Sequence, residues 1–380
     1  MTTLSPEGLN GLLAWLQEAQ LGLRALLHAL GLAPDIHGQP SWPFAQRIAG
    51  EMLALDAGHA RRVVTSLACL LLALLTLAVS LFWQRARYGL WTGAVAVMLL
   101  APWPESQLLL APAVPTSLHT SPSGFTADNI VRGQAVYQQQ CLRCHGEDGK
   151  GEGVDAAQLP MWPPTLNGSL LWKRLDGELF WRMRHGMQAR DGSTTMPGFG
   201  QQLSDTQVWQ VLDYLLANAS GQTLQESGAW TYPVRMPDAR VLCRTGQHRN
   251  VRSLVGQRLR IAADADSLQD DPRLVTVHVG IAAPDAECQA DAPALRTALA
   301  LVVGVPTAQL AGNQLLVDRG GWLRARSQPG KAAWSVNDLV CRTTTVASAA
   351  PEASLSDGLD GLIRRMDDEP VRLLRGGFPH

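Results

Sequence analysis

The sequence predicts a multidomain protein with transmembrane helices at the N-terminal end, an all-α domain in the middle and an α/β domain at the C-terminal end. Three observations in the 380-residue chain predict this order: an uncharged run at 63–83, a Cys-x-x-Cys-His motif at 141–145 that closes a helical segment, and strand-like segments from about 235 onward. A chain of this length has room for two or three domains, each with its own buried core.

Composition restricts the class of protein. The formal net charge is −1, so no basic surface for DNA or RNA is expected and no nucleic-acid partner is predicted. Charged residues make up 17% of the chain, and the first 110 residues are rich in Leu and Ala while the remainder is more polar. This asymmetry predicts that the N-terminal part is embedded in a membrane and that the remainder is exposed to water.

Residues 1–62 are expected to form amphipathic helices. Leucines recur at helical spacing along 9–32, and the segment PSWPF at 40–44 separates this stretch from a second helical piece at about 44–60. The first stretch either lies on the membrane surface or packs against the spans. The alternative is an ordinary amphipathic helix docked on a soluble domain.

A transmembrane region is predicted over 63–104. The run VVTSLACLLLALLTLAVSLFW at 63–83 is long enough to cross a bilayer as a helix. Trp83 lies at its end, where interfacial anchors occur, and Cys69 inside the run is expected to be a small apolar residue. The alternative is a buried helix of a soluble core, although such helices rarely stay apolar on every face.

A second span is predicted at about 88–103, after the basic turn QRARYG, and a re-entrant or interfacial segment is the alternative. Two spans would leave Arg85 and Arg87 in a cytoplasmic turn, as the positive-inside rule prefers, with both flanking parts on the opposite side. Arg61 and Arg62, at the start of the first span, weigh against this orientation.

A linker rich in Pro and Ser, 105–124, leads to the motif CLRCH at 141–145. The motif has the pattern of c-type haem attachment: Cys141 and Cys144 are expected to add across the two vinyl groups, and His145 to supply one axial nitrogen. A zinc site would need a second ligand pair at similar spacing. A thioredoxin-type redox pair usually opens a helix, whereas these cysteines close one. One covalent haem c is therefore the predicted cofactor.

The sixth iron ligand is predicted to be Met196, in the loop TTMPGFG, where a thioether can be presented without helix constraints. Thioether ligation raises the reduction potential, which suits electron transfer. The two methionines of the helical stretch DGELFWRMRHGM are more often core residues. The competing donors are Met161, Met183, Met187 and His185. The expected metal ligands are therefore His145 and Met196.

Residues 125–222 resemble a class I c-type cytochrome domain. The resemblance rests on an entry helix with Gly133 and Tyr137, the CLRCH motif, the Met-Pro loop, and a last helix with Trp209 and Tyr214. In this family the first and last helices cross, with a glycine of one against an aromatic residue of the other. Gly133 and either Tyr214 or Trp209 match those roles.

The same resemblance implies a proline whose carbonyl oxygen accepts a hydrogen bond from the ring N–H of the histidine ligand. The segment WPPTLNG offers Pro163 or Pro164, and Pro164 is the predicted residue, with a simple turn as the alternative for both. The segment SDTQ at 204–207 has the pattern of a capping box that opens the last helix.

Beyond about 235 the pattern changes to short strands, which predicts an α/β domain over 235–345 and a tail over 346–380 with one amphipathic helix. The order resembles a degenerate thioredoxin-like domain, in which a hairpin follows a helix. No Cys-x-x-Cys occurs there, so no thiol–disulfide activity is expected. Strands are expected at 258–263 and 273–281, helices at 288–305 and 335–341, and a hairpin at 313–327 with its turn at 319–321.

Three cysteines in this region, Cys243, Cys288 and Cys341, leave several interpretations open. In an oxidising compartment one pair would form a structural disulfide and leave one cysteine free. The alternatives are that all three are plain buried residues, or that some bind copper together with His248 or His278.

As a whole, the order of segments resembles the cytochrome-fused end of bacterial copper-resistance D type membrane proteins, with only two of that domain's helices. The resemblance to c-type cytochromes implies a haem domain in the periplasm, held at the bacterial inner membrane. The predicted function is single-electron transfer between redox protein partners, as a subunit of a membrane redox complex and not as an enzyme by itself. The alternative is a haem-containing redox sensor, or an assembly factor for a copper or haem enzyme.

Overall fold

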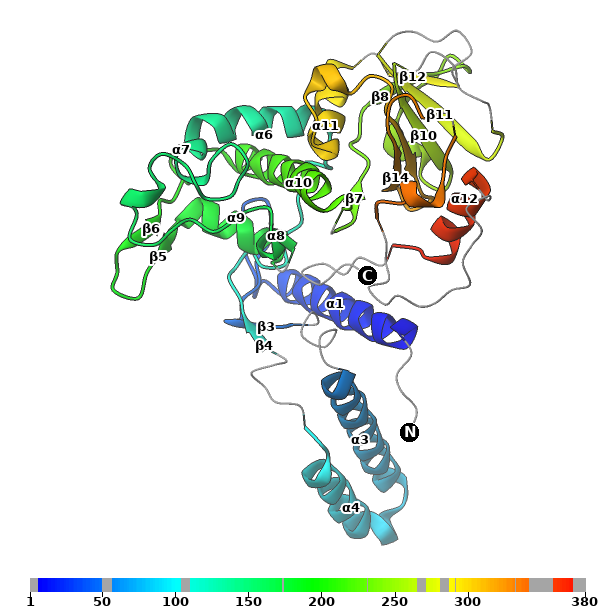
Figure 1. The fold of residues 1–380 in the computed structure, drawn as a ribbon. Coiled ribbons are helices and arrows are strands. Elements are labelled where there is room, and N and C mark those ends of the chain that lie inside the picture. The colour runs from blue at the N-terminus through cyan, green and yellow to red at the C-terminus, as the bar shows by residue number, and fades with distance from the viewer. Residues whose placement is uncertain are drawn as a thin grey trace. The chain divides into compact units, whose positions relative to one another are not determined.

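A computed structural model gives the fold of the chain (Figure 1). The chain divides into two compact units, one up to Leu118 and one from His119 onward, and each is described by itself. The structure describes residues 6–49, 57–103, 110–172, 174–230, 232–264, 271–280, 287–290, 292–331, 333–341 and 358–371.

The first unit combines three helices with short strands. The helix α1 confirms the amphipathic helix predicted within 9–32. Its buried face packs on β3, where Gln20 Nε2 donates to Ile48 O at 3.3 Å and Ile48 N donates to Gln20 Oε1 at 2.8 Å. The elements are α1 (Pro6–Ala29), β1 (Asp35–Ile36), β2 (Gln39–Pro40), β3 (Gln46–Ile48), α3 (Ala57–Phe82), η1 (Gln84–Ala86), α4 (Arg87–Leu100) and β4 (Leu110–Pro112).

The second helical piece predicted at 44–60 is wrong for Gln46–Ile48, which form the strand β3. Residues 50–56 lie outside the described residues, and the helix that follows begins at Ala57. A strand of three residues is too short to have a hydrophobic period of its own. The strand is stabilised by pairing with β4, far along the chain, which the local sequence does not reveal.

The linker predicted at 105–124 is also corrected in part. Residues 110–112 pair antiparallel with β3, and Trp42 N donates to Pro115 O at 2.8 Å. Residues 104–109 lie outside the described residues. The segment after β4 is therefore part of the first unit, because distant backbone groups satisfy its hydrogen bonds.

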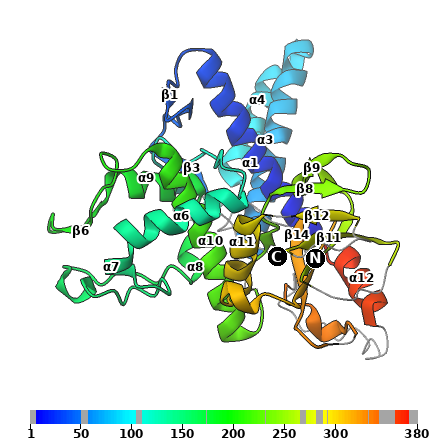
Figure 2. The ribbon, with the colours of Figure 1, turned by 90° about the horizontal axis from the view of Figure 1, so that it is seen from above.

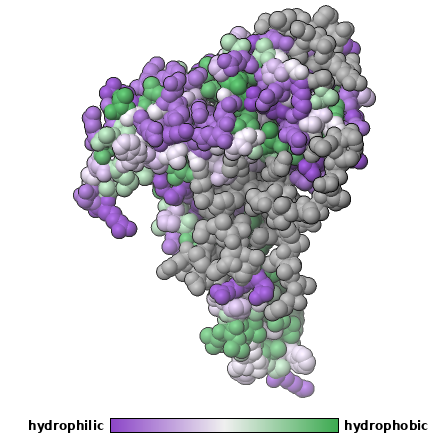
Figure 3. Space-filling view, in the orientation of Figure 1, coloured by the Kyte–Doolittle hydropathy of each residue, from purple (hydrophilic) through white to green (hydrophobic). Residues whose placement is uncertain are grey.

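The helices α3 and α4 form an antiparallel hairpin. Among the described residues, one helical segment, Arg61–Phe82, is long and apolar enough to cross a membrane, with a mean hydropathy of 2.5. α4 has 14 residues, which corresponds to about 21 Å of helix against about 30 Å of bilayer hydrocarbon. Figure 3 shows hydrophobic side chains over the hairpin and hydrophilic ones at its turn.

Small residues line the contact between the two helices. Ser66, Ala73 and Ser80 are buried on α3 at intervals of seven residues. Trp91 Nε1 donates to Ser80 Oγ at 2.9 Å, and Ser66 Oγ donates to Pro102 O at 2.9 Å. Small residues and hydroxyl groups at such contacts are typical of helices that associate in lipid. The return segment therefore follows α3 back to the level of Ser66.

The second unit begins with a helical half and a two-stranded ribbon. Its first and last long helices cross at Gly133, where a Cβ would lie 1.9 Å from the carbonyl oxygen of Gln210. The capping box predicted at 204–207 is confirmed, since Ser204 and Gln207 bond reciprocally. The elements are α6 (Ala127–Gln140), α7 (Leu142–His145), η2 (Ala156–Gln158), α8 (Ser169–Trp172), α9 (Asp176–His185), β5 (Met187–Gln188), β6 (Thr194–Met196) and α10 (Asp205–Ser227).

A curled eight-stranded sheet forms the other half of this unit, in the order β7-β14-β13-β10-β11-β12-β8-β9. β10, β11 and β12 are parallel, and the other neighbours are antiparallel. The elements are β7 (Val234–Arg235), β8 (Arg240–Cys243), β9 (His248–Asn250), η3 (Val251–Leu254), β10 (Arg258–Ala263), β11 (Leu274–Val279), β12 (Cys288–Ala290), α11 (Pro293–Val303), η4 (Thr307–Gln309), β13 (Gln314–Val317), β14 (Trp322–Ser327), η5 (Val336–Asp338) and α12 (Gly358–Asp368).

Two helices cover opposite faces of the sheet. Alternate residues of β13 separate the faces, because Leu315 and Val317 join the cluster with α11 while Leu316 joins the cluster with α12. Figures 1 and 2 show α11 between the sheet and the helices α6 and α10, with α12 on the far side. The amphipathic helix predicted in the tail is thus confirmed, and Leu362 within it is fully buried.

The strands predicted at 258–263 and 273–281 and the hairpin at 313–327 are confirmed. The helix predicted at 288–305 is wrong at its start, because Cys288–Ala290 pair with β11 and β8 as a strand. The helix predicted at 335–341 is wrong as well. It is the single turn η5, and both Val340 N and Cys341 N donate to Arg324 O. In both places contacts with distant strands override the local helical pattern.

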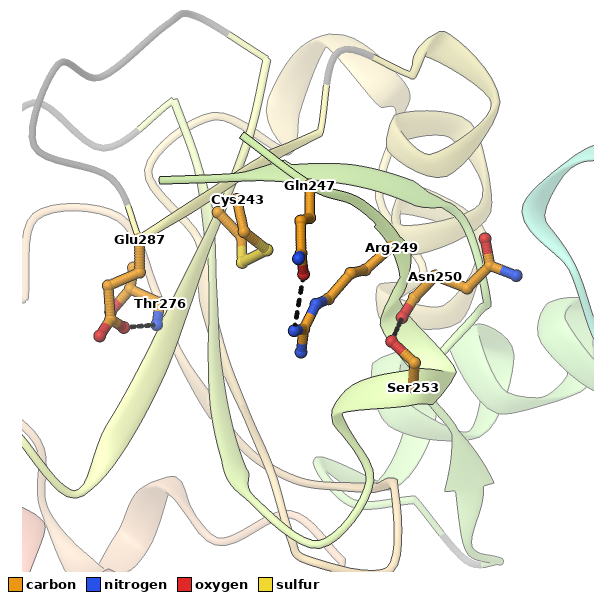
Figure 4. Close-up of a disulfide and its surroundings, with 8 residues drawn as sticks. Cys243, Gln247, Arg249, Asn250, Ser253, Thr276 and Glu287 are labelled. Atoms are coloured by element: carbon orange, nitrogen blue, oxygen red, sulfur yellow. Dashed lines mark hydrogen bonds between the residues drawn. A yellow bond between two sulfur atoms is a disulfide. The ribbon is translucent and has the colours of Figure 1, made fainter. Parts of the chain in front are cut away.

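A disulfide joins Cys243 of β8 to Cys288 of β12 (Figure 4). The two residues lie directly opposite each other in the antiparallel pair. Cys341 is free and buried, and its burial raises the pKa of its thiol to about 11. Of the interpretations left open by the sequence, the structure therefore has one structural disulfide and one free cysteine.

The helical half and the sheet share one continuous core. α11 packs on α6 and α10 so closely that a Cβ on Gly221 would lie 2.0 Å from the carbonyl oxygen of Leu301. Trp230 Nε1 donates to Val302 O at 3.0 Å, and both groups are buried. Ala127, Ile130 and other residues of the helical half belong to the same hydrophobic cluster as the sheet.

Asp213 of α10 is buried where several segments meet, with a relative exposure of 3%. Burial raises the pKa of its carboxyl to about 7, and Asp176 adds to the effect, while a hydrogen bond with Ser123 and the charge of Arg252 oppose it. Arg252 itself donates to the backbone carbonyl of Gly124. One carboxyl oxygen, Oδ2, has no hydrogen-bond partner among the described residues.

Asp213→Asn should flatten the pH dependence of unfolding. The folded pKa of about 7 lies above the ordinary value of 3.8, so the folded state binds the proton more tightly. Its contribution to stability is complete below about pH 4 and is lost as pH rises to about 7. The wild type should therefore lose roughly 2.5 kcal/mol of unfolding free energy between pH 5 and pH 8 through this group.

Denaturant titration of the detergent-solubilised protein at the two pH values measures this difference. The isosteric amide does not titrate, so the variant should show a smaller loss. An equal loss in variant and wild type would show that Asp213 is charged in the folded protein.

Candidate haem site

The Cys-x-x-Cys-His motif lies on one helical turn at the end of α6. Cys141 caps α6, and Cys144 N and His145 N both donate to Cys141 O, at 3.2 and 2.9 Å. Gly146 follows with a φ of 76°, a left-handed conformation that glycine adopts without strain and that ends the turn. The two thiols and the imidazole are therefore presented from one short segment.

The two cysteines of the motif form no disulfide. Cys141 is buried in a cluster with Tyr137, Phe180 and Trp209. Burial raises the pKa of the Cys141 thiol to about 12 and also raises the pKa of Cys144. Redox-active Cys-x-x-Cys motifs lower the thiol pKa to form a thiolate, so this environment differs from theirs.

The segment after the motif folds back over it. Gly151 N donates to His145 O at 2.9 Å, and Gly153 N donates to Cys144 O at 3.2 Å. Gly151 and Gly153 have no room for a side chain, since a Cβ would lie 2.2 Å from the carbonyl oxygens of Pro163 and Arg143 respectively. This return fixes the backbone of the turn that carries His145.

Two buried nitrogen atoms test whether the site fits a haem. His145 Nδ1 and Trp172 Nε1 have no hydrogen-bond partner among the described residues. Buried polar atoms are usually paired, so the site has hydrogen-bonding capacity that the described chain does not use. Burial also lowers the pKa of His145, which favours the neutral ring that binds metals. The residues therefore fit a group with polar edges and an iron atom.

Met196 ends the strand β6, which pairs with β5 so that Met196 lies opposite Met187. It is half-buried and packs against the same hydrophobic cluster that contains Cys141. The structure thus brings the predicted thioether and one predicted attachment cysteine to one core.

The other candidate donors lie in different environments. Met183 is buried on α9, as expected of a core residue, whereas Met161 and Met187 have relative exposures of 57% and 37%. His185 is exposed, and its ring stacks on Trp181 with 3.7 Å between centroids. Met196 as the sixth ligand stays a prediction, and none of these contacts argues for another donor.

The two prolines proposed for the hydrogen bond to the histidine differ in exposure. Pro164 is exposed, whereas Pro163 is buried with its carbonyl oxygen against Gly151. The structure gives neither carbonyl a hydrogen bond from His145 among the described residues. The role of Pro164 therefore stays a prediction, and Pro163 is the one with the buried carbonyl.

Sequence reasoning missed two residues of the site. Asn167 Nδ2 donates to Asp148 O, which ties the proline segment to the segment after the motif. Trp172 stacks on Tyr232 with 4.6 Å between ring centroids, beside its unpaired indole N–H. Asn167 lies in the quoted segment WPPTLNG and could have been noticed, whereas no spacing signal marks Trp172.

The comparisons with known proteins concern mainly the helical half. Residues 128–215 match the family model "Cytochrome C oxidase, cbb3-type, subunit III". No curated protein matches the chain.

Among solved structures, similarity to the following chain is limited to part of the sequence. The chain is 23% identical to a chain of the "Kuenenia stuttgartiensis reducing HAO-like protein complex Kustc0457/Kustc0458". The match has a TM-score of 0.23 and covers 32% of this chain and 57% of that chain. The similarity is too low to support an argument about fold or function.

The family match includes the Cys-x-x-Cys-His turn and the loop of Met196. Domains of this kind carry covalently attached haem c and transfer electrons. Residues 128–215 are therefore a c-type cytochrome domain.

Proposed function

We propose that the chain is a membrane-anchored c-type cytochrome that carries single electrons between redox protein partners on the periplasmic side of the bacterial inner membrane. The observation that carries this proposal is the single helical turn on which Cys141, Cys144 and His145 lie, beside the core that also receives Met196. Bound haem c would supply a one-electron iron couple, and a thioether ligand would raise its potential.

The residues of the chain would have separate tasks. Cys141 and Cys144 would hold the haem through thioether bonds, and His145 and Met196 would ligate its iron. Pro163 or Pro164 would orient the imidazole through a backbone carbonyl. With its iron held by His145 and Met196, the haem would supply one-electron chemistry, and the domain would transfer electrons between proteins.

Membrane anchoring is supported by the hairpin of α3 and α4. α3 is long enough to span the bilayer, and the hydrogen bond from Ser66 Oγ to Pro102 O returns the chain to the end at which α3 begins. We infer that the segment predicted at about 88–103 is a second, short span. Arg85 and Arg87 at the turn would then lie in the cytoplasm.

A periplasmic position for the second unit is supported by the disulfide between Cys243 and Cys288. Disulfides persist in oxidising compartments such as the bacterial periplasm and are rare in the cytosol. Haem is attached to bacterial c-type cytochromes in the periplasm, which agrees with a periplasmic position for the second unit.

The strand order of the sheet half, β14-β13-β10-β11, favours a degenerate thioredoxin-like domain, because β10 and β11 are parallel and the hairpin is antiparallel. We infer that this half docks a redox partner or braces the haem domain. The matched family model describes a subunit of an oxidase, which favours partners that are subunits of a membrane redox complex.

A second candidate function is a haem-containing redox sensor or an assembly factor for a copper or haem enzyme. The close packing of α11 on α6 and α10 favours it, because a change in the haem domain would act directly on the sheet half. A sixth ligand that dissociates easily would support this candidate over simple electron transfer.

Met196→Ala should abolish the weak sulfur-to-iron absorption band in the red region of the oxidised spectrum, because the thioether is removed. The wild type should show that band and a low-spin, six-coordinate spectrum. A high-spin or five-coordinate wild-type spectrum would count against simple electron transfer and for a sensor. Met187→Ala, on the opposite strand, is the matched control and should leave the band in place.

Replacing both Cys141 and Cys144 by alanine should give protein from which acid-acetone extracts any haem, because no thioether bond remains. Haem staining of a denaturing gel measures covalent attachment independently, because only covalently bound haem stays with the protein. Cys341→Ala is the control and should keep covalent haem. Haem that stays attached in the double variant would refute the proposed attachment site.

A reporter fused after residue 86 should be active in the cytoplasm, because the turn between the two helices would lie there. A fusion after residue 118 should report the periplasm. Periplasmic activity of the first fusion would exclude the two-span topology.

A further inference from the structure

We propose that Arg184 is a positioning residue that holds Met196 within reach of the haem iron, an inference that rests on the proposed ligation by Met196. Met196 is the last residue of the short strand β6 and is followed by a loop, so it does not lie within a helix. The structure gives the loop two supports, one on each side of Met196, and the Arg184 side chain forms much of the second.

The first support is short. β6 pairs with β5 over a few residues, and Thr195 Oγ1 donates to Met187 O at 3.1 Å. The register shifts between Met187 and Gln188. A ribbon of this length has little stability by itself, so it needs support from the segment that follows Met196.

That segment packs backbone to backbone on the end of α9. A Cβ on Gly186 would lie 2.5 Å from Met196 O, and a Cβ on Gly198 would lie 2.7 Å from the carbonyl carbon of His185. Phe199 N donates to Met183 O at 2.9 Å. The absence of side chains at both glycines lets the loop of Met196 lie directly on the last turn of the helix.

Arg184 contacts the same segment through both its backbone and its side chain. Its carbonyl oxygen accepts from Gly200 N at 2.9 Å, and its Nη1 donates to Leu203 O at 2.8 Å. The Cζ atom of the guanidinium group would lie 3.5 Å from a Cβ at Gly200. The guanidinium group thus lies against the backbone between Met196 and Leu203.

An ion pair through the same nitrogen, Nη1, also fixes the guanidinium group. Arg184 Nη1 lies 3.0 Å from Asp205 Oδ1, and the Arg184 side chain is 18% exposed. Asp205 is the first residue of α10, directly after the capping box at Ser204. Arg184 therefore connects the end of α9, the loop of Met196 and the start of α10, and the loop is held between two helices.

Displacement of the methionine by imidazole tests this role in the detergent-purified, oxidised full-length protein, with the sulfur-to-iron band as the readout. Arg184→Gln should lower the imidazole concentration at half-displacement about tenfold, equivalent to about 1.4 kcal/mol. Arg184→Lys keeps the charge near Asp205 but loses the planar guanidinium group. Its imidazole concentration at half-displacement should therefore lie between the values for Arg184→Gln and the wild type.

Two further variants make the result specific. Arg190→Gln removes the same charge from the exposed turn between β5 and β6 and should titrate like the wild type. Asp205→Asn weakens the ion pair with Arg184 and should lower the imidazole concentration at half-displacement about threefold. This variant tests the inference even if Arg184→Gln does not bind haem.

Wild-type titration in both Arg184→Gln and Asp205→Asn, with the band intact, would overturn this inference alone. Lower melting temperatures with unchanged imidazole titration would also overturn it, since they indicate a purely structural role. A wild-type protein without the band would overturn the ligation by Met196, and this inference with it.

Discussion

The helices α6 and α10 cross with their backbones in direct contact at Gly133. A Cβ at this position would lie 1.9 Å from the carbonyl oxygen of Gln210, so only glycine fits. The close crossing brings Tyr137 of α6 against Tyr214 of α10, with 5.0 Å between ring centroids. Tyr137 in turn donates its hydroxyl to Gly146 O at 2.7 Å, directly after the Cys-x-x-Cys-His turn. The position of Cys141, Cys144 and His145 therefore depends on a contact made two turns earlier in the helix.

α10 carries this constraint into the rest of the second unit. Its first half faces the cytochrome core through Val208, Trp209 and Leu212, and its second half contacts α11 at Gly221. The helical half and the sheet half therefore both pack on α10. This shared packing supports the proposal that the sheet half braces the haem domain or presents it to a partner.

The site is assembled from segments that are fixed at their ends. Glycines allow the segment after the motif to fold over His145 and allow the loop of Met196 to lie on α9. Apolar packing surrounds Cys141, while His145 Nδ1 and Trp172 Nε1 are buried without partners among the described residues. A mostly apolar site held by close backbone contacts is consistent with the electron transfer proposed for the domain.

The sequence by itself determined the features that depend on local chemistry. The CLRCH motif, the apolar run at 63–83, the capping box at Ser204 and the strands at 258–263 and 273–281 all follow from the residues of one local segment. It could not determine features made by segments far apart in the chain. Tertiary structure decided that β3 pairs with β4 and that Cys288 begins a strand, because each needs a distant backbone partner.

The same reason separates the parts of the haem site. Cys141, Cys144 and His145 are neighbours in sequence, so their common turn was predictable. Which proline carbonyl is buried, how Trp172 is placed, and that Arg184 reaches Asp205 across the loop of Met196 depend on packing between elements. Local spacing fixed the chemistry of the motif, and only the tertiary contacts decided how the rest of the chain surrounds it.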